Sequence, residues 1–154
     1  MAGLFFEDFT VGRTITHRPS RTVTETDNVL FSALTMNPQP LHLDHEFARA
    51  SQYGRPLVNG LFTLSLMMGL TVYETTLGTT GGNLGFEEMR FSAPVFVGDT
   101  LTAVTEVLSK RPSQSRPEFG IVELEHRCVN QHGAVALTCR RFALMLLRPA
   151  GEDG

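Results

Sequence analysis

Residues 59–74 read NGLFTLSLMMGLTVYE, and no charged side chain occurs among them before Glu74. Leucine, methionine, phenylalanine and valine fall on every side of a helix drawn through this stretch, with only threonine, serine and glycine between them. A helix without a polar face has no side suited to water, so we expect it to be buried all round. It is too short and too broken by glycine and threonine to span a bilayer. The stretch therefore predicts a buried central helix.

The second half of the chain is expected to cover this helix. The stretches typical of strands are residues 84–92, 100–109, 119–130 and 134–147. Along the third of these, apolar residues alternate with charged ones, and His126 falls on the apolar phase. At such a position a single histidine is more often a core or interface residue than a catalyst. Residues 77–83 are glycine-rich and expected to be loose. We therefore predict an α+β fold, a single domain over residues 1–154 with an antiparallel sheet wrapped around a central apolar helix.

The first half of the chain is expected to hold short helices joined by a stiff loop. Thr24 is a suitable cap for one helix, whose apolar stripe would be Val29, Leu30, Ala33 and Leu34. Asp44 is a suitable cap for a second helix, with Phe47 and Ala48 on its inner face. The prolines at positions 38 and 40 predict an irregular segment over residues 36–44. His17, His45 and His132 have polar neighbours and are expected at the surface.

Composition excludes several classes of function. A net charge of −3 gives no general attraction to nucleic acid. Cys128 and Cys139 do not have the spacing of metal ligands; they could face each other across a hairpin, but the stronger expectation is two small core residues. The first residues, MAGLFFEDF, lack the basic region of a signal peptide, so we expect a cytoplasmic protein. We expect no metal, no redox cofactor and no membrane association.

The loop before the central helix resembles a known family. Residues 31–44, FSALTMNPQPLHLD, followed by Phe47 and Ala48, are similar to the signature of the MaoC-like acyl-CoA dehydratases, the (R)-specific enoyl-CoA hydratases. Residues 54–60, GRPLVNG, resemble the family's Gly-x-Pro-Ile-Val-His-Gly approach to its central helix. Residues 94–99, PVFVGD, resemble its Pro-Val-Phe-x-Gly-Asp turn. The resemblance implies a hotdog fold, a dimer or higher homo-oligomer, and an acyl-CoA thioester as substrate, with coenzyme A as part of that substrate.

The resemblance also implies roles for particular residues. In the family an Asp and a His on the loop add water across the 2,3 double bond of an enoyl thioester, and the His matches His42. The imidazole side chain of histidine is well suited to exchange protons with water, because it can act as both acid and base near neutral pH. The backbone N–H of Gly60, at the start of the central helix, would stabilise the enolate oxygen, because it has no side chain in the way and the helix dipole favours negative charge.

The chain departs from the family signature at four positions. Aligned on Pro40 and His42, the catalytic Asp is Asn37 here, and the family's Gly is Met36. Gln39 and Asn59 replace the family's Asn and the His before the helix glycine, and both are candidate substrate-binding residues. An amide cannot take up a proton at neutral pH, so Asn37 can at most orient a water molecule while His42 transfers the protons.

Three functions compete at this stage. The first is a hydratase with the modified pair of His42 and Asn37. The second is a non-catalytic hotdog that binds acyl thioesters, or the inactive subunit of a heterodimeric hydratase, which the missing Asp would explain. The third is a thioesterase, which needs a carboxylate near the central helix. Glu74 lies at the wrong end of that helix, so this alternative ranks lowest.

Overall fold

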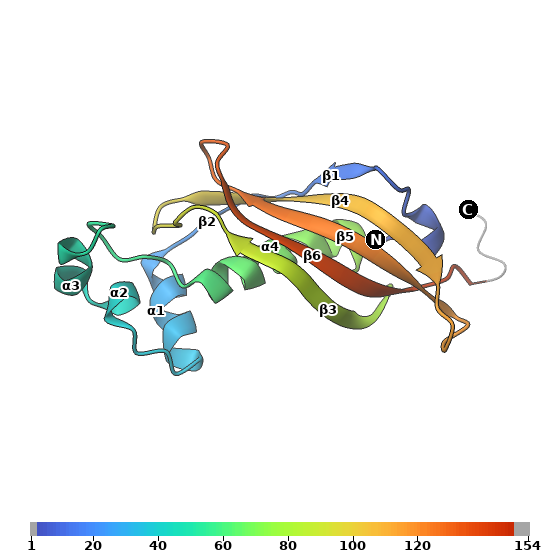
Figure 1. The fold of residues 1–154 in the computed structure, drawn as a ribbon, viewed down its shortest axis with the longest axis horizontal. Helices are drawn as coiled ribbons and strands as arrows, with labels where there is room; N and C mark the ends of the chain where they lie inside the picture. Colours follow the sequence, from blue (N-terminus) through green and yellow to red (C-terminus); the bar gives the residue numbers. More distant parts are fainter. Residues whose placement is uncertain (1–2, 150–154) are drawn as a thin grey trace.

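The computed structural model describes residues 3–149, and its organising element is the predicted central helix. Helix α4 (Gly60–Thr75) runs along one face of a six-stranded antiparallel sheet (Figure 1). The strands are β1 (Thr14–Thr16), β2 (Arg21–Thr22), β3 (Thr80–Phe91), β4 (Thr100–Pro112), β5 (Phe119–Val129) and β6 (Val135–Leu146). Their order is β1-β4-β5-β6-β3, with β2 also paired to β4, so β3 forms one edge. The predicted α+β fold with a central helix is confirmed.

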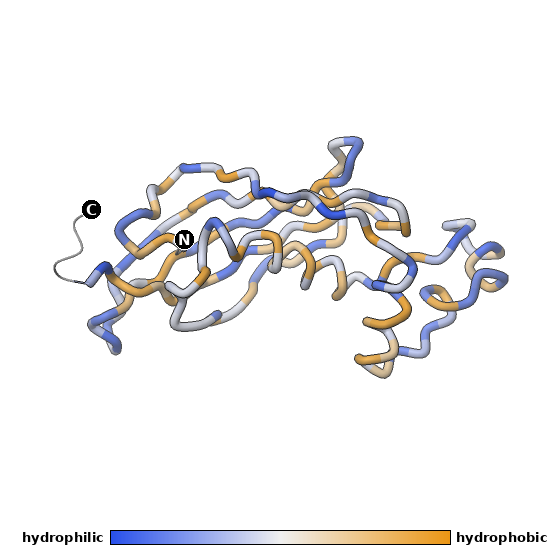
Figure 2. The backbone as a smooth tube through the Cα atoms, turned by 180° about the vertical axis from the view of Figure 1, so that it is seen from behind, coloured by the Kyte–Doolittle hydropathy of each residue, from blue (hydrophilic) through white to orange (hydrophobic). Residues whose placement is uncertain are grey.

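The core lies between α4 and the inner face of the sheet. Met67, halfway along α4, is fully buried against side chains of β4, β5 and β6. Figure 2 shows much of this helix in hydrophobic colours. Cys128 and Cys139 are free and buried in the same cluster, which confirms their interpretation as small core residues. Among residues 3–149, no helix is long and apolar enough to cross a bilayer.

The expectation that α4 is buried on every side is wrong. Its buried residues recur every fourth position, at Thr63, Met67, Thr71 and Thr75. The opposite face is open, and Leu61 and Tyr73 are 54% and 68% exposed. The sheet covers only one side of the helix, so the face that holds Leu61, Ser65, Gly69 and Tyr73 remains uncovered in the single chain.

Three short helices lie beyond one end of the sheet (Figure 1). α1 (Glu25–Leu34) begins at the predicted cap Thr24, whose side chain accepts from the Asp27 N–H. Its expected apolar stripe is exposed, however, and its buried residues are Asn28 and Ser32. The helix projects past the sheet, so its apolar side has no core to cover.

The other two helices also differ in part from expectation. α2 (Pro40–Leu43) lies within the segment expected to be irregular, because Pro40 occupies the first helical position, where proline is tolerated. α3 (His45–Ala50) is capped by Asp44 as predicted. Ala48 is buried as expected, but Phe47 is 51% exposed. A short 3-10 helix, η1 (Phe6–Asp8), precedes β1.

A chain of polar side chains crosses the core. Glu74 accepts from His17 Nδ1 at 2.7 Å, and His17 Nε2 lies 2.7 Å from Thr105 Oγ1. Thr105 Oγ1 in turn lies 2.8 Å from His126 Nδ1. The expected surface position of His17 is therefore wrong, since its side chain is fully buried. The expected core position of His126 is confirmed, since it is also fully buried.

The buried His126 predicts a loss of stability in mild acid. Burial, and next the charges of Arg141 and His17, lower the pKa of His126 to about 3. In the unfolded chain a histidine titrates near pH 6.5, so below that pH the unfolded state binds the extra proton. Stability is thus fully present above about pH 6.5 and falls by up to about 1.4 kcal/mol per pH unit toward pH 3.

Urea unfolding at pH 7.5, 6.0 and 5.0 measures this effect. We expect His126→Gln to flatten the pH dependence, whereas His132→Gln, on the exposed β5–β6 turn, should leave it unchanged. An equal slope for His126→Gln and the unmodified protein would contradict the prediction.

Candidate active site

The loop that carries His42 is shaped by its own polar side chains. Asn37 Oδ1 accepts from the Gln39 N–H at 3.1 Å, and Gln39 Oε1 accepts from the Leu41 N–H at 3.4 Å. Gln39 is thus the cap of α2, and His42 follows in the single turn of that helix. Met36, which precedes this loop, has a φ of 55°, a left-handed conformation that favours glycine. Met36 therefore adopts a backbone conformation that glycine adopts more readily.

The His42 ring is held in one tautomer. Its Nδ1 lies 2.8 Å from the backbone carbonyl of Leu57. A carbonyl can only accept, so Nδ1 carries the hydrogen and Nε2 keeps its lone pair. The side chain is half-buried. His42 is therefore oriented to accept a proton at Nε2.

Asn28 connects the three segments that form this region. Its Nδ2 donates to the backbone carbonyls of His42 at 2.9 Å and Leu57 at 3.2 Å. Its Oδ1 accepts from the Asn59 N–H at 2.8 Å. The side chain is 2% exposed, and its bond from the Asn59 N–H is buried while the other two are partly buried. Sequence reasoning missed Asn28, because an isolated polar residue in a helix usually faces solvent.

The start of α4 presents a free donor beside an apolar cavity. Asn59 Oδ1 accepts from the Leu61 N–H at 3.0 Å, which makes Asn59 the helix cap. The Gly60 N–H has no acceptor among residues 3–149. A Cβ added to Gly60 would lie 2.8 Å from Phe91 Cε1. Gly60 and Phe91 line a cavity of about 140 Å³, together with Leu57, Val58, Thr63, Ala93, Val95 and Ala136.

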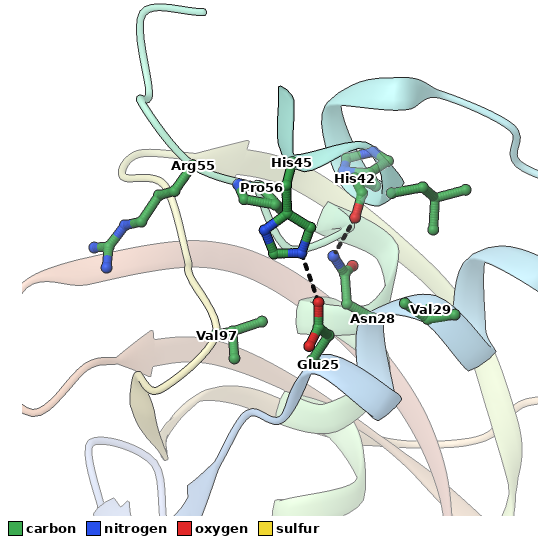
Figure 3. Close-up of a pocket in the computed structure, with 9 residues that line it drawn as sticks. Glu25, Asn28, Val29, His42, His45, Arg55, Pro56 and Val97 are labelled. Carbon is green, nitrogen blue, oxygen red and sulfur yellow. Dashed lines mark hydrogen bonds and ion pairs between the residues drawn. The ribbon is translucent and has the colours of Figure 1, made fainter. Parts of the chain in front are cut away.

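His42 lines a second cavity, of about 210 Å³ (Figure 3). Its other lining residues are Glu25, Asn28, Val29, Leu43, His45, Arg55, Pro56 and Val97. The two cavities have no lining residue in common, but Leu57 lines the Gly60 cavity and its carbonyl accepts from the His42 ring. A proton acceptor and a free backbone donor are thus linked through a single residue.

The predicted site residues divide into two groups. His42 and Gly60 have free polar groups at neighbouring cavities. The side-chain oxygens of Asn37, Gln39 and Asn59 each accept from a backbone N–H, as turn or cap residues. No hydrogen bond joins Asn37 to the His42 ring, both residues being within the described chain. Over residues 3–149 no cluster of three metal-ligating side chains occurs.

Comparison with known proteins gives consistent similarities. Residues 7–128 match the family described as "MaoC like domain". The chain is 36% identical over 147 residues to mesaconyl-CoA hydratase of Cereibacter sphaeroides, which covers 96% of this chain but only 42% of that protein. It is 39% identical over 108 residues to (R)-specific enoyl-CoA hydratase of Aeromonas caviae, covering 70% of this chain and 75% of the relative.

A solved structure identifies the fold. A Mycobacterium tuberculosis protein described as having a double hotdog fold superposes with a TM-score of 0.86 at 24% identity, over 99% of this chain and 47% of that one. The sheet and central helix are therefore a hotdog fold. The chain spans less than half the length of the mesaconyl-CoA hydratase it matches.

Proposed function

The chain belongs to the MaoC-like domain family, and from this premise we propose that it is a hydratase of acyl-CoA thioesters that adds water across a 2,3 double bond. The observation that carries the proposal is the tautomer of His42, because its Nδ1 donates to Leu57 and its Nε2 is left to accept a proton. The similarity to mesaconyl-CoA and (R)-specific enoyl-CoA hydratases supports the reaction class.

In the proposed mechanism His42 works as both base and acid. Nε2 takes a proton from a water molecule as the water oxygen bonds to C3 of the enoyl group. The electron pair of the double bond moves onto the thioester carbonyl, and the Gly60 N–H donates to the resulting enolate oxygen. His42 then returns the proton to C2, which gives the 3-hydroxyacyl thioester. The reverse sequence is dehydration.

The α4 dipole and Asn37 complete this proposal. The N-terminus of α4 favours negative charge next to Gly60, and one donor of this kind typically contributes about 2.7–4 kcal/mol to transition-state stabilisation. Asn37 would orient the water through its amide group. Coenzyme A belongs to the substrate, and we propose no other cofactor and no metal.

A hydration assay with Asn37→Asp distinguishes the proposal from its alternative. The unmodified protein, without any partner protein, is expected to hydrate crotonyl-CoA or mesaconyl-CoA, which is seen as loss of the enoyl absorbance. Asp at this position can still accept from the Gln39 N–H, so the loop should keep its shape, and Asn37→Ala controls for loss of that bond. If only Asn37→Asp is active, the chain is a binding module or the inactive subunit of a heterodimer.

We propose further that the chain forms a homodimer through α4 and the edge strand β3. Two surfaces of the single chain are uncovered. One is the open face of α4, and the other is the edge of the sheet at β3, along which apolar side chains are exposed. These side chains are Leu84, Phe86, Met89 and Phe91. Phe91 also lines the Gly60 cavity, so the proposed interface would border the site. Exposed apolar edges are usually covered in stable proteins.

Gly69→Glu tests this interface. Gly69 lies on the exposed face of α4, and a Cβ there meets open space in the single chain. The variant should therefore fold, but its charge would be buried in the dimer, and we expect light scattering to report a monomer. Val11→Glu, near the opposite edge of the sheet, should leave the mass of the dimer unchanged. A monomeric unmodified protein, or a dimeric Gly69→Glu, contradicts the prediction.

A further inference from the structure

Thr63, in the first turn of α4, has a buried hydroxyl without a hydrogen-bond partner. The residue is 2% exposed, and its Oγ1 has no donor or acceptor within reach among residues 3–149. A buried hydroxyl is unfavourable in a protein interior unless a hydrogen bond satisfies it. The Thr63 hydroxyl is thus available to bind a group from outside the described chain.

The other serine and threonine hydroxyls of α4 are engaged within the helix. Ser65, Thr71 and Thr75 each donate to a backbone carbonyl of the preceding turn, at distances between 2.6 and 2.8 Å. The carbonyl of Asn59 accepts from the Thr63 N–H at 3.2 Å, but not from its hydroxyl. A threonine in a helix has two favoured side-chain rotamers, and no hydrogen bond within residues 3–149 fixes Thr63 in either of them.

Thr63 shares a cavity with the free N–H of Gly60. Both residues line the cavity of about 140 Å³, and Thr63 supplies the single polar side chain among its lining residues. Side chains of a helix tilt toward its N-terminus, so Thr63 extends over the turn that begins with Gly60. The hydroxyl and the backbone N–H therefore belong to the same end of the same cavity.

The two donors are suitably spaced to bind one oxygen atom. Residues three positions apart on a helix are neighbours, with about 5–6 Å between their Cβ positions. A hydrogen bond of about 3 Å from each residue can therefore end on a single oxygen between them. The N-terminus of α4 adds partial positive charge at this point. Two such donors directed at one position form the kind of site that stabilises an oxyanion.

We propose that Thr63 is a further catalytic residue, whose hydroxyl donates a second hydrogen bond to the thioester oxygen on which the enolate charge develops. The first hydrogen bond is that of the Gly60 N–H. This proposal rests on the proposed function, because it takes the thioester carbonyl to lie at Gly60. The hydroxyl keeps its proton throughout, so the proton transfers by His42 are unchanged. Apolar walls keep water from competing with the two donors, which strengthens their effect.

Thr63→Val tests the proposal, because valine has nearly the shape of threonine but no hydroxyl. We expect kcat for hydration of crotonyl-CoA to fall by about 100-fold, the lower end of the range typical for loss of one such donor, while KM changes little. The unfolding temperature should be equal or higher, because the substitution removes an unpaired buried hydroxyl. Thr63→Ser, which keeps a hydroxyl, should retain most of the rate.

Thr71→Val is the matched control on the same face of α4. Thr71 is also buried, but its hydroxyl donates to the Met68 carbonyl at 2.8 Å and the residue does not line the Gly60 cavity. We expect its kcat to stay within a few-fold of the unmodified value. Equal losses of kcat in Thr63→Val and Thr71→Val would overturn the proposal.

The infrared spectrum of a bound thioester reports the two donors directly. Butyryl-CoA has no 2,3 double bond and cannot be hydrated, and carbon-13 at its thioester carbon identifies the carbonyl band. Each hydrogen bond to the oxygen polarises the carbonyl and lowers its stretching frequency. We expect the band to lie at a higher frequency in Thr63→Val than in the unmodified protein, whereas Thr71→Val should match the unmodified protein.

The remaining outcomes separate this proposal from the proposed function. An unmoved carbonyl band in Thr63→Val, or a kcat within a few-fold of the unmodified value, shows that the hydroxyl does not bind the thioester oxygen. If the unmodified protein does not hydrate crotonyl-CoA but the butyryl-CoA band still shifts in Thr63→Val, the proposed function fails and both donors still bind the thioester oxygen. If the unmodified protein does not bind butyryl-CoA, both are wrong.

Discussion

Replacing His42 with alanine is expected to lower the rate of crotonyl-CoA hydration by about 100- to 10,000-fold, the range typical of a general acid–base group. The loss should be at the upper end, because the chain has Asn37 where the family signature has its Asp. The Asn37 amide cannot take over the proton transfer. The rate is followed by loss of the enoyl absorbance.

His45→Ala is the matched control for this substitution. His45 lines the same cavity as His42, but its ring is largely exposed and contacts Glu25 (Figure 3). We expect His45→Ala to stay within a few-fold of the unmodified rate. Similar thermal unfolding of both variants would show that the His42 effect is chemical. A His42→Ala protein within 10-fold of the unmodified rate would rule out His42 as the proton-transfer group.

Asn28→Leu is expected to cause the largest loss of stability among single substitutions near the site. It removes three hydrogen bonds and leaves the carbonyl of His42 and the N–H of Asn59 without the Asn28 partner, while the Leu57 carbonyl keeps only its bond from the His42 ring. Each buried unsatisfied group costs about 1–3 kcal/mol, so the sum for two groups is about 2 kcal/mol or more. Urea unfolding measures this change.

The same substitution should also reduce activity, because Asn28 positions His42 through the His42 carbonyl. Displacement of the His42 backbone and of the Leu57 carbonyl would loosen the ring that accepts the proton. We expect the fall to be mainly in kcat, with the assay run well below the unfolding temperature. Asn28→Asp, which keeps one acceptor for the Asn59 N–H, should retain more stability than Asn28→Leu.

Ser32→Ala is the matched control on the same helix. Ser32 is as buried as Asn28 and lies one turn further along α1, but its hydroxyl has no partner in the described part of the chain. Its removal should cost little stability and leave hydration unchanged. Equal effects of Ser32→Ala and Asn28→Leu would mean that burial, and not the three hydrogen bonds, accounts for the result.

Sequence patterns were reliable where the physical cause is local. The helix α4 follows from a largely apolar stretch without charge before Glu74, and β5 from strict alternation of buried and half-buried residues. The caps Thr24 and Asp44 follow from side chains that bond to N–H groups two or three residues away. The start of β3 was missed because its pairing with β6 outweighs the low strand preference of its glycines.

Patterns failed where burial depends on distant segments. The apolar stripe of α1 predicted a buried face, but the helix extends past the sheet and that face is open. His17 has polar neighbours in sequence, yet its partners Glu74 and Thr105 are 57 and 88 residues away. A single sequence contains no local sign of such contacts.

The sequence by itself determined the central helix, the approximate positions of β4, β5 and β6 and the loop that carries His42, because each depends on spacing, turn residues or capping within a few positions. Only the tertiary structure decided which nitrogen of His42 is free, why Asn28 is needed, and that His17 and His126 share a buried polar network through Thr105. These features arise where segments far apart in the chain meet away from water, and there each polar group must find a partner that its neighbours in sequence do not reveal.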